Sequence, residues 1–278
     1  MNPFSALSEL IPAGVMQTYV VIMFLAVIAG TVLDIMHKKS AEFFFENSRK
    51  AKEAGLRKLD SSEMSSIAIQ TATVDVLTSA EFCNPHRRQA HLLTMYGFIV
   101  FLISTIVLVF GYTGAGASSG NFWGLLWHIG AVMVCVGGFW FWFAIRVDVS
   151  AEGNPWYRIV RADLFILSLL GTTTFGLLWS VFQAAGANGL SGLFFLLFLI
   201  SSLVLFGGVY WSKFAHMFFK PAAAFQKRVA KADGSLDNLP EPADRTDPAS
   251  RDRHSMELLK DAPLDMGLGI KREKPQHY

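Results

Sequence analysis

The sequence predicts an all-α polytopic membrane protein, a bundle of five transmembrane helices with its N-terminus outside and its C-terminus in the cytoplasm. Of its 278 residues, 52% are hydrophobic and only 17% charged, whereas about a quarter of a soluble domain is charged. Three long stretches carry no Asp, Glu, Lys or Arg, and all 24 Lys and Arg residues fall in segments on one predicted side. This composition excludes a wholly soluble protein.

The uncharged stretches locate the spans. Residues 10–33, 89–145 and 164–212 are free of charge over 24, 57 and 49 residues. A helix needs about 20 residues to cross the hydrocarbon core, so these stretches accommodate one, two and two spans. Gly-rich segments at 112–121 and 185–192 divide the two longer stretches. We expect spans at 15–36, 91–112, 122–145, 164–185 and 193–217.

The basic residues predict the orientation. Nine lie in 38–90, three in 146–161 and twelve from residue 213 onward, whereas the N-terminus and the two hairpin loops have none. Because Lys and Arg concentrate in cytoplasmic loops, segment 1–14 is predicted to lie outside. The five-helix membrane domain is then 15–220, and it includes the cytoplasmic segment 38–90. That segment begins with an aromatic and basic stretch, which predicts either a helix on the membrane surface or a solvated connector.

The C-terminal segment 221–278 is polar and Pro-rich, which predicts a largely disordered cytoplasmic tail. Apolar residues recur between 256 and 270, where a solvated tail has no need of them. They indicate a docking peptide for a soluble partner, with plain disorder as the alternative. We expect that partner to contact 38–90 and 250–278, together with membrane lipid and no nucleic acid.

Two histidines at the predicted cytoplasmic ends of spans are candidate haem ligands. His91 opens the second span and His216 closes the fifth. Imidazoles from two helices are a usual way for a membrane bundle to hold b-type haem. Asn84 and Pro85 predict an N-cap and a first-turn proline, which place His91 about two turns into its helix. We therefore predict one haem b on the cytoplasmic side, with His86 as the fallback ligand.

The neighbours of these histidines fit that prediction. Gly208 and Ser212 would lie two turns and one turn before His216 on one helix face, leaving a slot for a flat macrocycle. Arg87 and Arg88 lie where the haem propionates need cations. The alternative is that His91 and His216 are interfacial histidines bonded to headgroups or to backbone. Cys83 and Cys135 are too few for a Cys-ligated iron–sulfur cluster, and no C-x-x-C-H motif is present.

Three further polar residues lie within predicted spans or at their ends. Asp34 and His37 are one turn apart near the cytoplasmic end of the first span. A carboxylate in a membrane helix is costly, so they are candidates for proton delivery to a quinone. An interfacial ion pair with Lys38 or Arg161 is the alternative. His128 has no second histidine at its depth, so we expect it to pack with a hydrogen bond to a neighbouring helix.

Two sequence strings resemble a known family. They are RQAHLLTMYGF at 88–98 and KFAHMFFKP at 213–221. They are similar to the second and fifth helices of the cytochrome b membrane subunits of respiratory nitrate reductase and of quinone-interacting oxidoreductases of sulfur metabolism. Within that group, the chain most resembles the membrane anchor associated with dissimilatory adenylylsulfate reductase. The resemblance covers about residues 15–220 and includes the five-span layout.

The resemblance implies a function and also a departure from the family pattern. It implies a subunit of the bacterial cytoplasmic membrane that passes electrons between cytoplasmic adenylylsulfate reductase, working in sulfite oxidation, and the quinone pool. The second ligand pair of the nitrate reductase subunit is not matched here, because Phe101 and Phe198 lie near those positions. No catalysis on sulfur is expected of this chain. A haem-free membrane scaffold that recruits the cytoplasmic enzyme is the main alternative, and a small transporter is a further one.

Overall fold

The computed structural model describes residues 2–38, 40–80, 82, 84–113, 121–148, 153–212, 216–236 and 239. Seven side chains inside these ranges lie outside the description: Lys38, Ser40, Ala41, Phe43, Asn121, His216 and Phe218. The described part of the chain is helical and contains no strand, in agreement with the predicted all-α class.

Five of the described helices are long and apolar enough to cross a membrane, which confirms the prediction of a multi-pass membrane protein. They are α2 (Ala13–Lys38), α5 (Pro85–Gly111), α6 (Asn121–Trp140) with the π-helical turn η2 (Phe141–Ile145), α7 (Leu164–Ala184) after the 3-10 turn η3 (Arg161–Asp163), and α8 (Asn188–Gly207). The spans formed by α2, by α6 with η2, and by α7 begin and end within a few residues of the predicted bounds. Helix α5 ends as predicted but begins at Pro85, earlier than the predicted residue 91.

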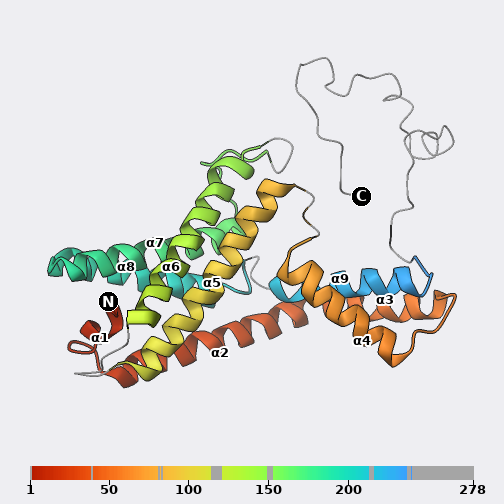
Figure 1. Ribbon diagram of the computed structural model, residues 1–278, viewed down its shortest axis with the longest axis horizontal. Coiled ribbons are helices and arrows are strands. Elements are labelled where there is room, and N and C mark those ends of the chain that lie inside the picture. Colours follow the sequence, from red (N-terminus) through yellow and green to blue (C-terminus); the bar gives the residue numbers. More distant parts are fainter. Residues whose placement is uncertain are drawn as a thin grey trace, which may run out of the picture.

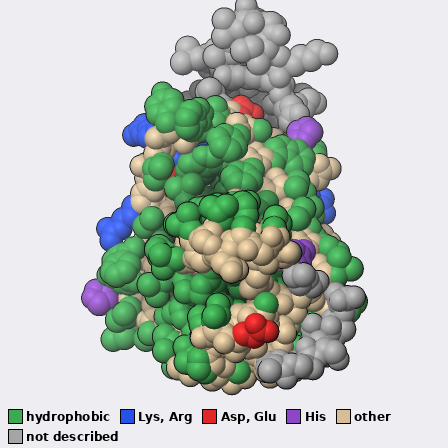
Figure 2. All heavy atoms as spheres, turned by 90° about the vertical axis from the view of Figure 1, so that its left-hand side faces the viewer, with side chains coloured by type: hydrophobic (Ala, Val, Ile, Leu, Met, Phe, Trp, Pro, Cys, Tyr) green, Lys and Arg blue, Asp and Glu red, His purple; other side chains and the backbone are tan. Residues whose placement is uncertain are grey.

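The two ends of the bundle differ in composition. The N-terminus and the short helix α1 (Pro3–Leu7) lie at one end, which we call the N-terminal end (Figure 1). The connections that carry the described Lys and Arg residues belong to the other end, which we call the basic end. Figure 2 views the molecule from the N-terminal end and shows a mainly hydrophobic surface with few charged side chains. Such a surface fits a lipid environment.

The fifth span is shorter than predicted and ends earlier. We expected it to run from 193 to 217, but α8 ends at Gly207. The Gly208 amide still donates to the Val204 carbonyl at 2.9 Å, and the Ser212 amide then donates to the Gly208 carbonyl at 2.9 Å. A Cβ at Gly208 would lie 2.3 Å from the Val204 carbonyl oxygen, so this turn needs glycine. The prediction of one helix through residue 217 is therefore wrong, and His216 begins a separate helix.

Helices α5 and α6 pack with their backbones in close contact. A Cβ at Gly130 would lie 2.6 Å from the Phe101 backbone nitrogen, and one at Gly137 would lie 2.6 Å from the Ala90 carbonyl oxygen. Small residues at such crossings let two membrane helices gain van der Waals contact that larger residues would prevent. This pair therefore forms a rigid wall of the bundle.

Helix α1 closes the N-terminal end. Phe4 is 5% exposed, and its ring lies edge-on to Trp127 and Trp179, with centroid distances of 6.0 and 5.4 Å. The Asn2 side chain accepts from the Phe4 amide at 3.0 Å and donates to the Tyr112 carbonyl at 3.1 Å. The predicted outer segment 1–14 is thus partly folded into the bundle.

Four elements pack together at the basic end, and we call them the basic platform. They are α3 (Ser40–Ala54), α4 (Ser61–Gln70), the π-helical η1 (Thr71–Leu77) and α9 (His216–Ala232). Helix α9 contacts each of the other three, and α3, α4 and α9 lie side by side in Figure 1. The predicted tail boundary at residue 221 falls inside α9. The start of the tail, which lacks the apolar content to fold alone, therefore folds against segment 38–90.

Hydrogen bonds connect the C-terminal part of α9, and the residue that follows it, to the other elements of this platform. Arg228 binds Asp75 of η1 through two bonds, with Nε–Oδ2 and Nη2–Oδ1 distances of 2.5 and 2.8 Å. Beyond the helix, the Leu56 amide donates to the Asp233 carbonyl at 2.9 Å, and Arg57 Nε donates to the Ala232 carbonyl at 2.9 Å. Segments about 150 residues apart in the sequence are joined here.

Arg57 also organises the start of α4. Asp60 caps the helix by accepting from the Glu63 amide at 2.7 Å, and the Glu63 side chain accepts from the Asp60 amide at 3.2 Å. Arg57 Nη1 donates to Glu63 Oε1 at 2.7 Å, and this bond holds the pKa of the Glu63 carboxyl below its usual value. The pKa of Asp60 is lowered chiefly by its backbone hydrogen bond.

A buried ion pair shapes the connection between α6 and α7. Arg146 is fully buried, and its Nη2 lies 2.5 Å from Asp163 Oδ2. The guanidinium also donates to the carbonyls of Pro155 and Arg158 at 2.8 and 2.7 Å, and it lies 4.2 Å from the Trp142 ring centroid. Although Arg146 Nε has no hydrogen-bond partner within the described residues, the bonds of the two terminal nitrogens join both sides of this loop.

Candidate functional site

His91 lies in the second turn of α5, at the basic end. The predicted start of the helix is confirmed, because Asn84 caps it by accepting from the amides of His86 and Arg87 at 2.9 and 3.1 Å, and Pro85 occupies the first turn. The imidazole of His91 is partly buried, and its ring centroid lies 4.8 Å from that of Phe82. The local sequence therefore places a histidine just inside the apolar part of the helix.

Ser79 orients the imidazole of His91. Its Oγ lies 3.1 Å from His91 Nδ1 and donates to the Val76 carbonyl at 3.3 Å. A hydroxyl has one hydrogen, and when Val76 accepts it the Nδ1–H of His91 donates to Ser79. A neutral imidazole of this tautomer carries its lone pair on Nε2, as an iron ligand requires.

The backbone at Ser79 is in an uncommon conformation. Its φ is +50°, in the left-handed region, and the residue is only 3% exposed. A non-glycine residue adopts this region at an energetic cost, which surrounding contacts must offset. Here Arg88 Nε donates to the Thr78 carbonyl and Tyr96 Oη donates to the Leu77 carbonyl, both at 2.7 Å. Side chains of α5 thus hold the end of η1 against His91.

Arg87 and Arg88, the predicted propionate partners, lie beside His91 and differ in their contacts. The Arg87 guanidinium lies 5.7 Å from the Phe82 ring centroid, and Arg88 bonds the Thr78 carbonyl. His86 is exposed, with its ring centroid 5.9 Å from that of Trp140. The predicted contacts of the two arginines with haem propionates, and of His86 with the haem iron, stay predictions.

The predicted slot beside His216 does not form as expected. We placed Gly208, Ser212 and His216 on one helix face, but α8 ends at Gly207 and α9 begins at His216. The helical spacing that stacked the three residues therefore does not apply. The His216 side chain lies outside the described residues. The b-type haem therefore stays a prediction: the structure places His91 beside Ser79, and the side chain of the second predicted ligand is not among the described residues.

Asp34 and His37, the predicted proton donors, face different surroundings on α2. Asp34 is only 2% exposed, whereas His37 is exposed. His37 Nδ1 lies 3.2 Å from the Leu33 carbonyl oxygen, and its ring centroid lies 5.6 Å from that of Tyr210. The alternative ion pair with Lys38 involves a side chain outside the described residues.

His128 packs as predicted. Its Nδ1 donates to the Gly124 carbonyl at 2.6 Å, and its Nε2 lies 2.8 Å from Ser180 Oγ on α7. Both ring nitrogens are therefore engaged: the Nδ1 bond lies within α6, and the Nε2 bond joins α6 to α7. Among the described residues, no group of three or more His, Cys, Asp or Glu side chains is placed to hold a metal ion.

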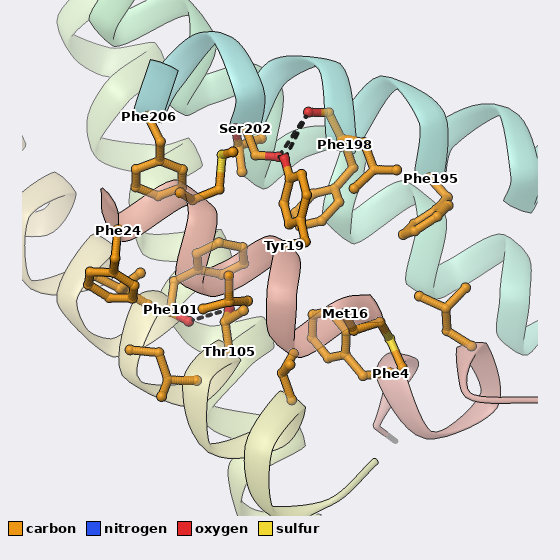
Figure 3. Close-up of a pocket in the computed structure, with 18 of the residues that line it drawn as sticks. Phe4, Met16, Tyr19, Phe24, Phe101, Thr105, Phe195, Phe198, Ser202 and Phe206 are labelled. Carbon is orange, nitrogen blue, oxygen red and sulfur yellow. Dashed lines mark hydrogen bonds between the residues drawn. The ribbon is translucent and has the colours of Figure 1, made fainter. Parts of the chain in front are cut away.

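The sequence analysis missed a pocket of about 340 Å³ between α1, α2, α5 and α8 (Figure 3). Phe101 and Phe198 line it from α5 and α8, and they are 5% and 7% exposed. These are the positions near which the resemblance would place a second ligand pair. No motif marks the pocket, because its mostly apolar lining residues come from several helices that are far apart in the sequence.

Comparisons with known proteins identify no relative. No protein-family model, no curated protein and no solved structure matches the chain. The functional conclusions below therefore depend on the residues and geometry of this chain and on the resemblance of its two short strings.

Proposed function

We propose that this chain is a membrane anchor and electron-transfer subunit. In this proposal its basic end faces the cytoplasm, binds an oxidoreductase there, and connects that enzyme to the quinone pool through one b-type haem. The main support is the bond between His91 and Ser79, because it joins a candidate iron ligand to the segment that continues from the basic platform. Docking and redox chemistry would then occur at the same end.

The residues have distinct parts in this proposal. When bound, the haem would supply one-electron transfer. His91 would hold it on one side through Nε2, oriented by the Nδ1–H bond to Ser79. His216 would hold it on the other side, with Arg87 and Arg88 near the propionates.

Quinone reduction also consumes protons. Asp34 is a buried carboxylate at the basic end of α2, and His37 lies one turn closer to the aqueous phase. In our proposal His37 takes up a proton from water and Asp34 delivers it toward the quinone. The cost of burying an ionisable group in a membrane helix supports a role of this kind for Asp34.

The basic platform is the proposed docking surface for the enzyme. The ion pair between Asp75 and Arg228 holds it together, so it presents a folded surface beside the bundle. The resemblance points to adenylylsulfate reductase as the partner and to the bacterial cytoplasmic membrane as the location. The other proposed contact, 250–278, lies outside the described residues. The separation of basic residues supports the orientation, with the N-terminus outside and the C-terminus in the cytoplasm.

The test is a reduced-minus-oxidised absorbance spectrum of the purified protein. We expect an α-band of b-type haem at about one haem per chain. His91→Ala should abolish it, whereas His86→Ala, at an exposed histidine five residues earlier, should retain it. A band that survives His91→Ala but not His86→Ala would reassign the ligand. No band in the intact protein, even after haem reconstitution, would refute electron transfer by haem.

A haem-free scaffold is the second candidate. The end of α8 at Gly207 favours it, because the slot expected beside His216 depended on a longer helix. The scaffold would recruit the same cytoplasmic enzyme through the basic platform without carrying electrons. An absent haem band together with retention of adenylylsulfate reductase on membranes that contain this chain would support the scaffold over the electron-transfer subunit.

A further inference from the structure

The pocket of Figure 3 extends along much of the bundle. It has a volume of about 340 Å³ and runs from Phe4 at the N-terminal end to Met217 at the basic end. Along α2 its lining extends from Val15 to Val27, which corresponds to ~18 Å at the helical rise. The space is therefore long and narrow, with a shape closer to an extended hydrocarbon chain than to a flat ring system.

The pocket is closed toward one end and open toward the side. Phe4 and Leu7 of α1 are both 5% exposed and form its N-terminal closure. Val15 and Phe24 also line the pocket, yet they are 57% and 43% exposed. Because α2 is one of the membrane-spanning helices, its exposed apolar residues face lipid. A ligand would therefore enter laterally, from the bilayer.

The hydroxyl groups between α2 and α8 bond one another. Tyr19 Oη lies 2.8 Å from Ser202 Oγ, and Ser202 Oγ donates to the Leu199 carbonyl at 3.0 Å (Figure 3). Tyr19 Oη is also placed to donate to the Leu199 carbonyl at 3.3 Å, so each hydroxyl has an acceptor within the protein for its single hydrogen. Neither hydroxyl has a hydrogen left to donate to a ligand.

The threonines of the lining are satisfied in the same way. Thr105 Oγ1 donates to the Phe101 carbonyl at 2.8 Å and accepts from Trp127 Nε1 at 3.0 Å. Thr172 Oγ1 donates to the Ser168 carbonyl at 2.8 Å. Each described hydroxyl that lines the pocket thus has its hydrogen in a bond within the protein.

This lining selects against polar ligands. A buried carbonyl or charged group without a hydrogen-bond partner would be strongly disfavoured here, and a quinone ring carries two carbonyl acceptors. Water needs two to four polar partners and would find few. The only part of a membrane amphiphile that the pocket suits is its hydrocarbon chain, with the polar head left at the membrane surface.

We propose that this pocket binds one acyl chain of a membrane phospholipid, which enters beside α2 and lies between α2, α5 and α8. The chain fills space that the side chains leave open and connects the bundle to its lipid surroundings. This site is independent of the haem and of the soluble partner, so it can be tested whether or not the proposed function holds.

The test is native mass spectrometry of the delipidated full-length protein, after incubation with palmitoyl-oleoyl phosphatidylglycerol in detergent. We expect one retained phospholipid per chain. Val20→Phe and Ile106→Phe fill the pocket from α2 and α5, and each should reduce the occupancy at least about tenfold. Val21→Phe and Ile103→Phe are matched controls at exposed positions outside the lining, and they should retain it.

Two quinone probes separate the possible sources of the ligand. A ubiquinone without its tail should not bind, because its carbonyl groups would lack partners. Competition with a ubiquinone that has a full prenyl tail decides between the two kinds of hydrocarbon chain. Displacement by the tailed quinone would overturn the assignment to phospholipid. Equal binding of the tail-less quinone would overturn the conclusion that the pocket accepts only a chain. Retention of phospholipid by both filled variants would also refute the proposal. So would a failure of the native chain and its control variants to retain phospholipid.

Discussion

Breaking the ion pair between Asp75 and Arg228 tests whether the basic platform is one folded unit. Asp75→Asn keeps the shape of the side chain and removes its charge. The two side chains are 10% and 27% exposed, so solvent screens the pair only in part. A hydrogen bond to a charged group contributes about 1.5–3 kcal/mol, and we discount two such bonds for this exposure and for the amide that remains. The expected loss is about 2 kcal/mol for docking of α9.

That loss corresponds to roughly a 30-fold larger population of undocked α9. Limited trypsin digestion of the purified protein measures this population, because α9 contains cleavable basic residues, Lys227, Arg228 and Lys231, that are cut when the helix opens. Cleavage tracks the open population when opening and closing are fast relative to cutting. We expect cleavage within α9 to accelerate by about the same factor in Asp75→Asn.

The control is Glu53→Gln, which breaks the ion pair between Arg49 and Glu53 on α3. Those side chains are 65% and 62% exposed, so their pairing contributes little and cleavage should change by no more than a few-fold. If Asp75→Asn changes cleavage in α9 by less than about threefold, the ion pair does not hold the platform. Apolar packing would then have to account for the docking of α9.

Three further predictions concern other polar groups of the basic end. Ser79→Gly relieves the strain of the left-handed backbone but removes the hydrogen-bond partner of the His91 imidazole, so haem retention in titrations should fall about tenfold. Ser79→Asn supplies an acceptor and tolerates that backbone, so it should restore haem retention. Equal retention in both variants would contradict the orienting role of Ser79. Asp163→Asn leaves the buried charge of Arg146 without its counter-ion and should lower the free energy of unfolding by about 3 kcal/mol. The measurement is the melting temperature in detergent, which should drop clearly. An unchanged melting temperature would show that the backbone carbonyl oxygens alone stabilise the Arg146 charge. The pKa of Glu63 is lowered by its bond to Arg57, so its contribution to platform stability is complete above the unfolded pKa and is lost as the pH falls through the lower folded pKa. The protection of the α4 amides against hydrogen exchange, relative to the intrinsic exchange rate at each pH, should therefore stay constant from neutral pH to about pH 5 and fall below about pH 4. Glu63→Gln should weaken that dependence, and the lowered pKa of Asp60 accounts for what remains.

Some features of the site were predictable because they depend on short segments. Asn84 and Pro85 start α5 where the capping pattern placed them, since a cap involves only the first turn of a helix. His128 packs between helices as expected for a histidine without a partner at its depth. By contrast, the bond between Ser79 and His91 requires η1 to fold back on α5, and no local pattern predicts that approach.

The sequence by itself determined that this is a five-span membrane protein with its basic residues gathered at one end. Crossing a bilayer depends on the length of uncharged segments, which is a property of each segment alone. The tertiary structure decided where α8 stops, how α9 docks on Asp75, and that a pocket remains between α1, α2, α5 and α8. Those features depend on which surfaces meet and how completely they fill the space between them. In a chain whose spans are uniformly apolar, that information becomes available only when the helices are packed together.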